Sequence, residues 1–114
     1  MVVSNHGGRQ LDGALASLRA LPGVVEQAGH LPVLLDSGVR RGSDVLKALA
    51  LGASFVFLGR PFNFAAAVGG ERGVTHAIRL LHDEIDRDMA LLGVSGCGEL
   101  SQGFLRPASR STTP

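Results

Sequence analysis

The residues best suited to chemistry in this 114-residue sequence lie in short glycine-containing stretches, of which the first is VVSNHGGRQLDG at residues 2–13. It places His6 between an apolar run and paired glycines, with Arg9 three residues later. Because imidazole titrates near neutral pH, His6 is suited to act as a general base. Arg9 is suited to grip a carboxylate through two parallel hydrogen bonds. The alternative interpretation makes His6 a hydrogen-bonded structural residue of its loop.

Two further stretches, DSGVRRGSD at residues 36–44 and LGRP at residues 58–61, each set glycine beside arginine just before a predicted helix. A helix start offers free N–H groups and the positive end of a dipole to an anion, and glycine lets the backbone approach that anion closely. On consecutive strands, such a pair is typical of a phosphate clamp. The alternative is that the glycines only turn the chain and the arginines are solvated.

The three stretches are positioned by a repeated unit, in which an apolar strand is followed by a polar loop and then by a helix. Strands are predicted at MVVS, at residues 31–35 and in SFVFLGRP. After the first strand, Asp12 is expected to cap a helix through residues 14–21 that continues past Pro22 through residues 24–29. After the second, Ser43 or its neighbour is expected to cap a helix that Gly52 closes.

The third strand is followed by two predicted helices. Pro61 is well placed in the first turn of a short helix through residues 62–68. A longer helix over about residues 71–92 carries an apolar stripe, and Gly93 is expected to end it. Residues 103–114 lose this periodicity and gain proline, serine and threonine, so we expect a mobile tail after a structured region at residues 1–102.

The fold class that these patterns indicate is α/β. Each predicted strand is a continuous apolar run followed by a helix, which is typical of a parallel sheet buried on both faces. The polar residues of all three stretches then lie at the carboxyl ends of their strands. Active sites of β/α barrels gather at that end, but so do the ligands of doubly wound open sheets, and the topology alone does not separate the two.

Composition excludes several classes of function. With 45% hydrophobic residues the chain has ample core material, whereas its formal net charge is only +1 and its arginines are scattered, so we expect no nucleic-acid partner. Cys97 has no second thiol to pair with, and His76 and His82 miss the i,i+4 spacing of a metal pair, so no metal site is expected. No apolar run approaches the roughly 18 residues of a transmembrane segment.

The three stretches together resemble the carboxyl-terminal third of the FMN-dependent α-hydroxy-acid dehydrogenases and oxidases, a family that includes lactate dehydrogenases, glycolate oxidases and mandelate dehydrogenases. The motifs VVSNHGGRQLDG, PVLLDSGVRRGSDVLKALALGA and VFLGRPF carry the resemblance, which covers about residues 2–100. It implies a partial TIM (β/α)8 barrel, made of the last three βα units with strands six to eight. The nearest members are the bacterial lactate dehydrogenases.

The resemblance also implies a role for each polar residue of the three loops. His6 is implied to be the acid/base that removes a proton from the 2-hydroxy acid, from carbon or from oxygen, while electrons pass to FMN, and Arg9 to bind the substrate carboxylate. The implied cofactor-binding residues are Ser4 against the flavin, Asp36 with the backbone of Ser37, Gly38 and Val39 along the ribityl chain and phosphate, and Arg40, Gly59 and Arg60 at the phosphate.

The sequence departs from the family pattern in two ways. Several family members have two glycines after the second strand's aspartate, where this chain has Ser37 and Gly38, a change expected to be tolerated. The larger departure is length, because such barrels have about 250 residues or more. The family's flavin-binding lysine, its substrate-side tyrosines and the aspartate that orients the histidine all lie upstream of these motifs. Met1 stands where the sixth strand is already under way, so we expect a fragment or a truncated reading frame.

Two hypotheses of function follow. In the first, the chain is the end of a larger enzyme that oxidises a small 2-hydroxy acid, L-lactate above all, to the 2-oxo acid. In the second, it is an inactive fragment or a weak FMN- or phosphate-binding module that needs a separate amino-terminal half. A clamp for some other phosphorylated ligand ranks last, because it leaves SNHGGRQ unexplained. We expect a cytoplasmic protein or one peripheral to the inner face of the membrane, inactive as an isolated chain, and the full-length form is compatible with a homo-oligomer.

Overall fold

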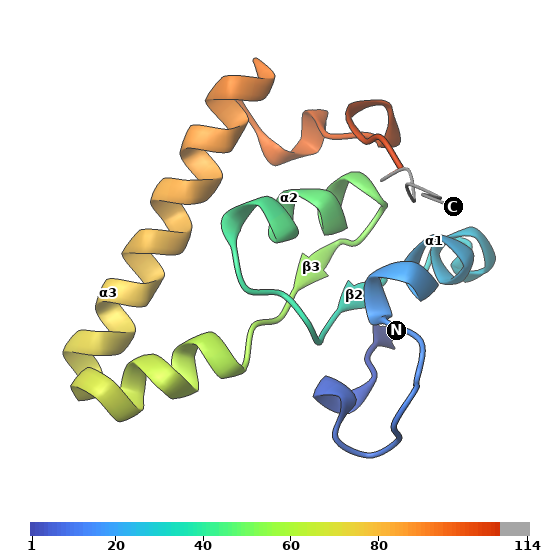
Figure 1. Cartoon of the computed structure of the whole chain (residues 1–114). Helices are drawn as coiled ribbons and strands as arrows, with labels where there is room; N and C mark the ends of the chain where they lie inside the picture. The colour runs from blue at the N-terminus through green and yellow to red at the C-terminus, as the bar shows by residue number, and fades with distance from the viewer. Residues whose placement is uncertain (108–114) are drawn as a thin grey trace, which may run out of the picture.

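A computed structural model describes residues 1–107 of the chain. Three short parallel strands form one sheet in the order β1 (Val2–Val3), β2 (Leu34–Leu35) and β3 (Phe55–Val56). Their register sets Val2 beside Leu34, and Leu34 beside Phe55. The predicted α/β class and the parallel order of the strands are therefore confirmed (Figure 1).

Three helices follow the strands in turn: α1 (Ser17–Ala28), α2 (Gly42–Ala50) and α3 (Arg60–Leu92). Single 3-10 turns lie at His6–Gly8, Cys97–Glu99 and Gln102–Phe104. Among the described residues, no helix is both long and apolar enough to cross a bilayer. Residues 103–107 of the expected tail are described and begin within the last of these turns, while the rest of that tail, residues 108–114, lies outside the described residues.

The core lies on one face of the sheet only. Because side chains alternate along a strand, Val3, Leu35 and Val56 share one face, and they pack with Leu21 of α1 and Ala48 of α2. Leu35 and Leu21 have no exposed surface. The opposite face carries Val2 and Phe55, which are 57% and 56% exposed. Burial on both faces, which the apolar runs predict, is therefore not reached by these residues alone.

The helix caps differ from the predicted ones. Asp12 does not cap α1, because this helix begins only at Ser17 after Ala16, and the Asp12 carboxylate instead accepts the N–H of Gly13 at 2.9 Å. Ser43 lies inside α2, whose N-cap is Arg41. Asp44, the neighbour of Ser43, supplies the carboxylate that accepts the N–H of Arg41 at 3.1 Å. Sequence patterns thus placed the helices correctly and their first residues wrongly.

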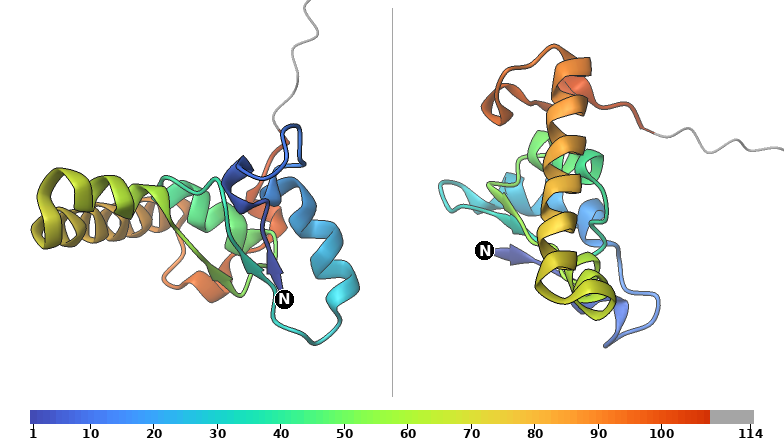
Figure 2. Two further views of the ribbon diagram at one scale, coloured as in Figure 1. Left: turned by 90° about the horizontal axis from the view of Figure 1, so that it is seen from below. Right: turned by 90° about the vertical axis from the view of Figure 1, so that its left-hand side faces the viewer.

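The long helix α3 is two helical segments joined at a sharp bend, as predicted for residues 62–68 and 71–92. Gly69 and Gly70 leave helical geometry there, and Gly70 has a φ of +55° that favours glycine. The segment after the bend returns along α2 (Figure 1, Figure 2). Pro61 lies in the first turn and Gly93 ends the helix in the left-handed conformation, so both of these predictions are confirmed. The first turn of α3 therefore lies by the end of β3, whereas its second segment packs on α2.

Candidate active site

A cavity of about 190 Å³ opens at the carboxyl ends of the three strands. Every predicted site residue except Ser4 lines it, so the structure brings together side chains from three separate loops. Those residues are His6, Arg9, Asp36, Ser37, Gly38, Val39, Arg40, Gly59 and Arg60. Convergence of this kind is what a ligand site requires, since a few polar groups must meet at one hollow.

The loop after β1 holds His6 in a constrained backbone. His6 has a φ of +55°, which is uncommon for a residue other than glycine, and its N–H donates to Ser4 Oγ at 3.1 Å. The Arg60 guanidinium donates to the carbonyl of Gly7 at 2.5 Å, and a Cβ on Gly7 would lie only 2.8 Å from that guanidinium. Strained backbone held by neighbours is a mark of functional loops. Here it places the imidazole at the rim of the cavity.

A hydroxyl and carboxylate network joins this loop to the one after β2. Ser4 Oγ donates to Asp36 at 2.6 Å, and Ser37 Oγ donates to the same carboxylate oxygen at 3.1 Å. The Ser4 hydrogen bond holds the pKa of Asp36 below its usual value of 3.8, against the opposing effect of partial burial, and Ser37 and the charge of His6 act in the same direction as Ser4. Asp36 is therefore a carboxylate at neutral pH. It can accept hydrogen bonds from hydroxyl groups of a ligand.

Ser37 has a backbone conformation that favours glycine. Its φ of +84° lies in the left-handed region, where a side chain is unfavourable. The hydroxyl makes contacts that offset part of that cost, because it accepts the N–H of Gly7 at 3.0 Å and lies 3.2 Å from Ser4 Oγ. Ser4 lies outside the cavity lining, and its contacts place it behind Asp36 and Ser37 rather than in the hollow itself.

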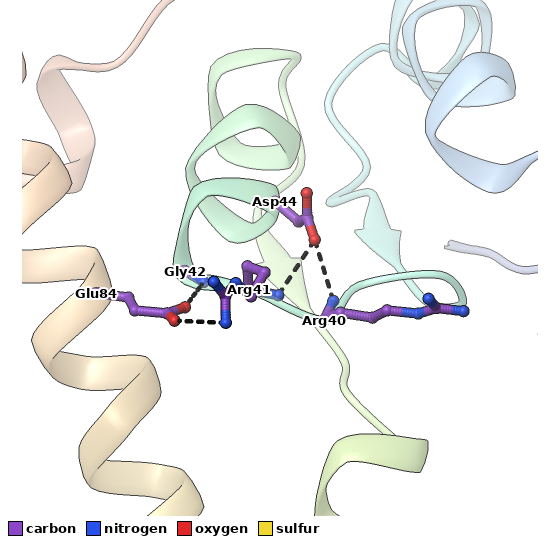
Figure 3. A network of polar contacts seen from close by, with 5 residues as sticks. All are labelled: Arg40, Arg41, Gly42, Asp44 and Glu84. Carbon is purple, nitrogen blue, oxygen red and sulfur yellow. Dashed lines mark hydrogen bonds and ion pairs between the residues drawn. The ribbon is translucent and has the colours of Figure 1, made fainter.

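At the start of α2, the protein itself engages three N–H groups that the sequence pattern predicted to be open to a ligand. The Asp44 carboxylate accepts the N–H groups of Arg40 and Arg41, each at 3.1 Å, and the Glu84 carboxylate accepts that of Gly42 at 2.7 Å (Figure 3). The protein's own acids therefore complement this end of the helix dipole. What this loop presents to the cavity is the Arg40 side chain and the backbone of Gly38 and Val39.

The start of α3 is the helix terminus that faces the cavity. Gly59 is its N-cap without a side-chain cap, and the next residues, Arg60 and Pro61, also line the hollow. Within residues 1–107, no hydrogen bond engages the backbone N–H groups of Gly38, Val39 or Gly59. Phosphate groups are typically bound by free backbone N–H groups, the positive end of a helix dipole and guanidinium groups. All three are present here, the guanidinium groups being those of Arg40 and Arg60. The residues present therefore fit the phosphate end of FMN.

Four cavity residues were not predicted from the sequence: Gly7, Phe57, Pro61 and Asn63. Of these, the sequence pattern places Pro61 only in the first turn of a helix, and Gly7 only as one of the paired glycines after His6. Phe57 comes just after β3 and is 42% exposed, and Asn63 is in the first turn of α3. Their place at the carboxyl end of a strand and at a helix start was the signal that could have found them. In the described part of the chain, no group of three or more His, Cys, Asp or Glu residues is arranged to hold a metal.

Comparison with known proteins bears on the whole of this region. The family model described as FMN-dependent dehydrogenase matches residues 1–107. The chain belongs to this family. FMN is accordingly its cofactor, and the family chemistry is the oxidation of 2-hydroxy acids.

The chain is similar to relatives that are named as oxidases of two small acids. It is 55% identical over 106 residues to an L-lactate oxidase of Nostoc sp., an alignment that covers 92% of this chain and 29% of the relative. It is 53% identical to glycolate oxidase 2 of Oryza sativa subsp. indica, with the same coverage of both proteins. The chain thus spans about 29% of the length of these relatives.

Solved structures of the family superpose closely on the chain. An (S)-mandelate dehydrogenase matches with a TM-score of 0.90 and 47% identity, over 94% of this chain and 30% of the other. A mandelate oxidase in complex with benzoyl-formic acid matches with a TM-score of 0.81 and 48% identity, over 85% of this chain and 29% of the other. The three βα units of this chain therefore have the fold of the corresponding part of these enzymes.

Proposed function

We propose that the chain is the carboxyl-terminal third of an FMN-dependent enzyme that oxidises L-lactate to its 2-oxo acid, and supplies the last three βα units of its barrel. The observation that carries the proposal is the cavity at the carboxyl edge of the sheet, where His6, Arg9 and Arg40 meet. The identity with an L-lactate oxidase supports lactate as the substrate, and the similar identity with a glycolate oxidase supports a small 2-hydroxy acid in general.

In this proposal, His6 and Arg9 handle the substrate. Arg9 binds the carboxylate of the hydroxy acid in a bidentate manner, which fixes the neighbouring C2 against the imidazole. His6 takes one proton from the substrate as C2 is oxidised. FMN, when bound, would accept the two electrons and the second proton.

The remaining cavity residues hold the cofactor. Arg40, Gly59 and Arg60 bind its phosphate, with Gly38 and Val39 contributing backbone N–H groups. Asp36 accepts hydrogen bonds from the hydroxyl groups of the ribityl chain, and Ser37 with Ser4 keeps that carboxylate ionised. Arg60 also ties the phosphate end to the His6 loop through the carbonyl of Gly7, so that cofactor and substrate groups are placed relative to each other.

A second candidate function is a flavin-binding module that pairs with a separate amino-terminal half. The exposed sheet face favours it, because Val2 and Phe55 need a covering layer that these residues do not supply. In either case, we expect the isolated chain to bind flavin without oxidising lactate, since a histidine without its orienting partner loses control of its tautomer.

The phosphate site is tested by titrating the 114-residue chain with FMN and with riboflavin, which lacks the phosphate, and following flavin fluorescence. Arg40→Ala is expected to weaken FMN binding at least about tenfold, as for loss of one charge-assisted contact, and to leave riboflavin unaffected. Arg19→Ala, on the exposed surface of α1, is the matched control and should bind FMN as the parent chain does. Equal affinity of the parent chain for FMN and riboflavin would overturn the assignment of the clamp.

A further inference from the structure

Two parts of helix α3 that are far apart in its sequence lie against different parts of the candidate site: one lines the cavity, and the other contacts the loop after β2. Its first turn supplies Arg60 to the lining, and after the bend at Gly69 and Gly70 it returns along α2. There, Glu84 meets the loop that carries Arg40. One Glu84 carboxylate oxygen accepts the N–H of Gly42 at 2.7 Å, and the other lies 3.3 Å from the Arg41 guanidinium (Figure 3).

The backbone at Gly42 packs closely against α3. Gly42 is buried, and a Cβ at this position would lie 2.6 Å from Glu84 Cβ and 2.7 Å from the backbone nitrogen of Ile85. The backbones of α2 and α3 therefore touch here. Residues 36–41 form the segment between β2 and α2. Strand β2 holds one end of this segment, and the contact of Glu84 with Gly42 holds the other.

The two adjacent arginines of this segment have different surroundings. Arg40 lines the cavity, whereas Arg41 does not and is paired with Glu84. Figure 3 shows their side chains separated, with Arg41 beside Glu84 and Arg40 directed away from it. The Glu84 carboxylate thus pairs with the guanidinium of Arg41 beside α3. The Asp44 carboxylate accepts the backbone N–H groups of both arginines. This division leaves one arginine to face the ligand.

We propose that Glu84 is a positioning residue for the phosphate of FMN. By holding the Gly42 N–H and the Arg41 side chain, it fixes the loop so that Arg40 and the backbone of Gly38 and Val39 are placed toward the phosphate. The inference rests on the proposed function, since it assigns the cavity to FMN. It adds a residue that lies outside the cavity lining and acts only through the loop.

The test compares Glu84→Ala, Glu84→Gln and Asp83→Ala in the 114-residue chain. Asp83 is the matched control, an exposed acid next to Glu84 on α3. The first measurement is amide hydrogen exchange, which needs no flavin. Glu84→Ala is expected to speed exchange of the Arg40, Arg41 and Gly42 amides by about tenfold, as for loss of one charge-assisted hydrogen bond, with α1 unchanged. Glu84→Gln keeps an acceptor for the Gly42 N–H and should restore most of the protection.

The second measurement is flavin affinity. Glu84→Ala is expected to weaken FMN binding about tenfold while riboflavin binding stays as in the parent chain, and Asp83→Ala should change neither. Unchanged exchange at residues 40–42 in Glu84→Ala would overturn the proposal, whatever the flavin result. Equal losses for FMN and riboflavin would also overturn it, because Glu84 would then support the fold and not the phosphate. Failure of the parent chain to prefer FMN would instead count against the proposed function, while the exchange result still decides the role of Glu84 in the loop.

Discussion

At the scale of single residues, the site depends on small hydroxyl groups as much as on the charged side chains that the motifs make conspicuous. Ser4 and Ser37 both donate to one oxygen of Asp36, and Ser37 also accepts the N–H of Gly7. These contacts connect the loop of His6 to the loop that carries Arg40. A charged residue can be found by its type, whereas these serines gain their importance only from what they touch.

The ionisation of Asp36 gives a prediction at this scale. The Ser4 hydrogen bond is the largest cause of the lowered pKa, so Ser4→Ala should raise the pKa of Asp36 toward its usual 3.8. Carboxyl-carbon NMR titration of the chain measures this directly, with Ser101→Ala, on the exposed surface, as the control. An unchanged Asp36 titration in Ser4→Ala would contradict the assigned network.

The same pKa has a consequence for stability. Because the pKa of Asp36 is lower in the folded than in the unfolded chain, its ionised form stabilises the fold at pH values above 3.8. That contribution is lost as the pH falls through the lower, folded pKa. The parent chain should therefore lose stability below pH 3.8 by more than Ser4→Ala does, which urea unfolding at neutral and acid pH would show.

Site residues were predictable from the sequence to the extent that they lie at strand ends. His6, Arg9 and the DSGVRR and LGRP stretches could be placed at one edge because parallel strands end together, and the structure does bring them to one cavity. Phe57 and Asn63 were missed because an aromatic ring after an apolar strand and an asparagine in a helix resemble ordinary core and surface residues. Their roles in binding, like those of the predicted residues, stay predictions.

At the scale of elements, the order and type of strands and helices followed from apolar periodicity, but the helix starts did not. At the start of α2, the local Asp44 accepts two N–H groups, and Glu84, which lies 42 residues beyond Gly42, accepts that of Gly42. The start of α1 shifted to Ser17 although Asp12 offered a suitable cap. Local sequence contains Asp44 but not the tertiary contact of Glu84, so the helix itself was predicted, whereas the engagement of the Gly42 N–H could not be.

The α2–α3 contact gives a prediction at this scale. Gly42→Ala puts a Cβ against the backbone of Ile85, and overpacking of this kind destabilises a fold by about 1–3 kcal/mol. Gly23→Ala is a matched control, because nothing lies within 4 Å of a Cβ there and alanine is favoured over glycine in a helix by up to about 1 kcal/mol. Urea midpoints should fall for the first variant and hold or rise for the second. Equal stability of Gly42→Ala and the parent would contradict the close contact.

In the molecule as a whole, helices cover one face of the sheet and leave the other face exposed. Its helices cover Val3, Leu35 and Val56, whereas Val2, Phe55 and Phe57 remain exposed on the other side. The two phenyl rings pack edge to face with centroids 5.2 Å apart, but they do not cover each other. Both edge strands, β1 and β3, can accept a further strand. This surface is what a barrel interior requires, and it agrees with a chain that spans about 29% of its relatives.

The proposed function requires this chain to provide the acid/base and the phosphate site of an FMN-dependent 2-hydroxy-acid oxidation. The most direct test captures the native polypeptide from its source with an antibody to RLLHDEIDRDM, residues 79–89, and adds L-lactate to the captured protein without oxygen. We predict a polypeptide heavier than 11.8 kDa that carries FMN and whose flavin absorbance bleaches on addition of lactate. A captured protein that carries FMN but is bleached by neither lactate nor glycolate, or that carries no flavin, would contradict it.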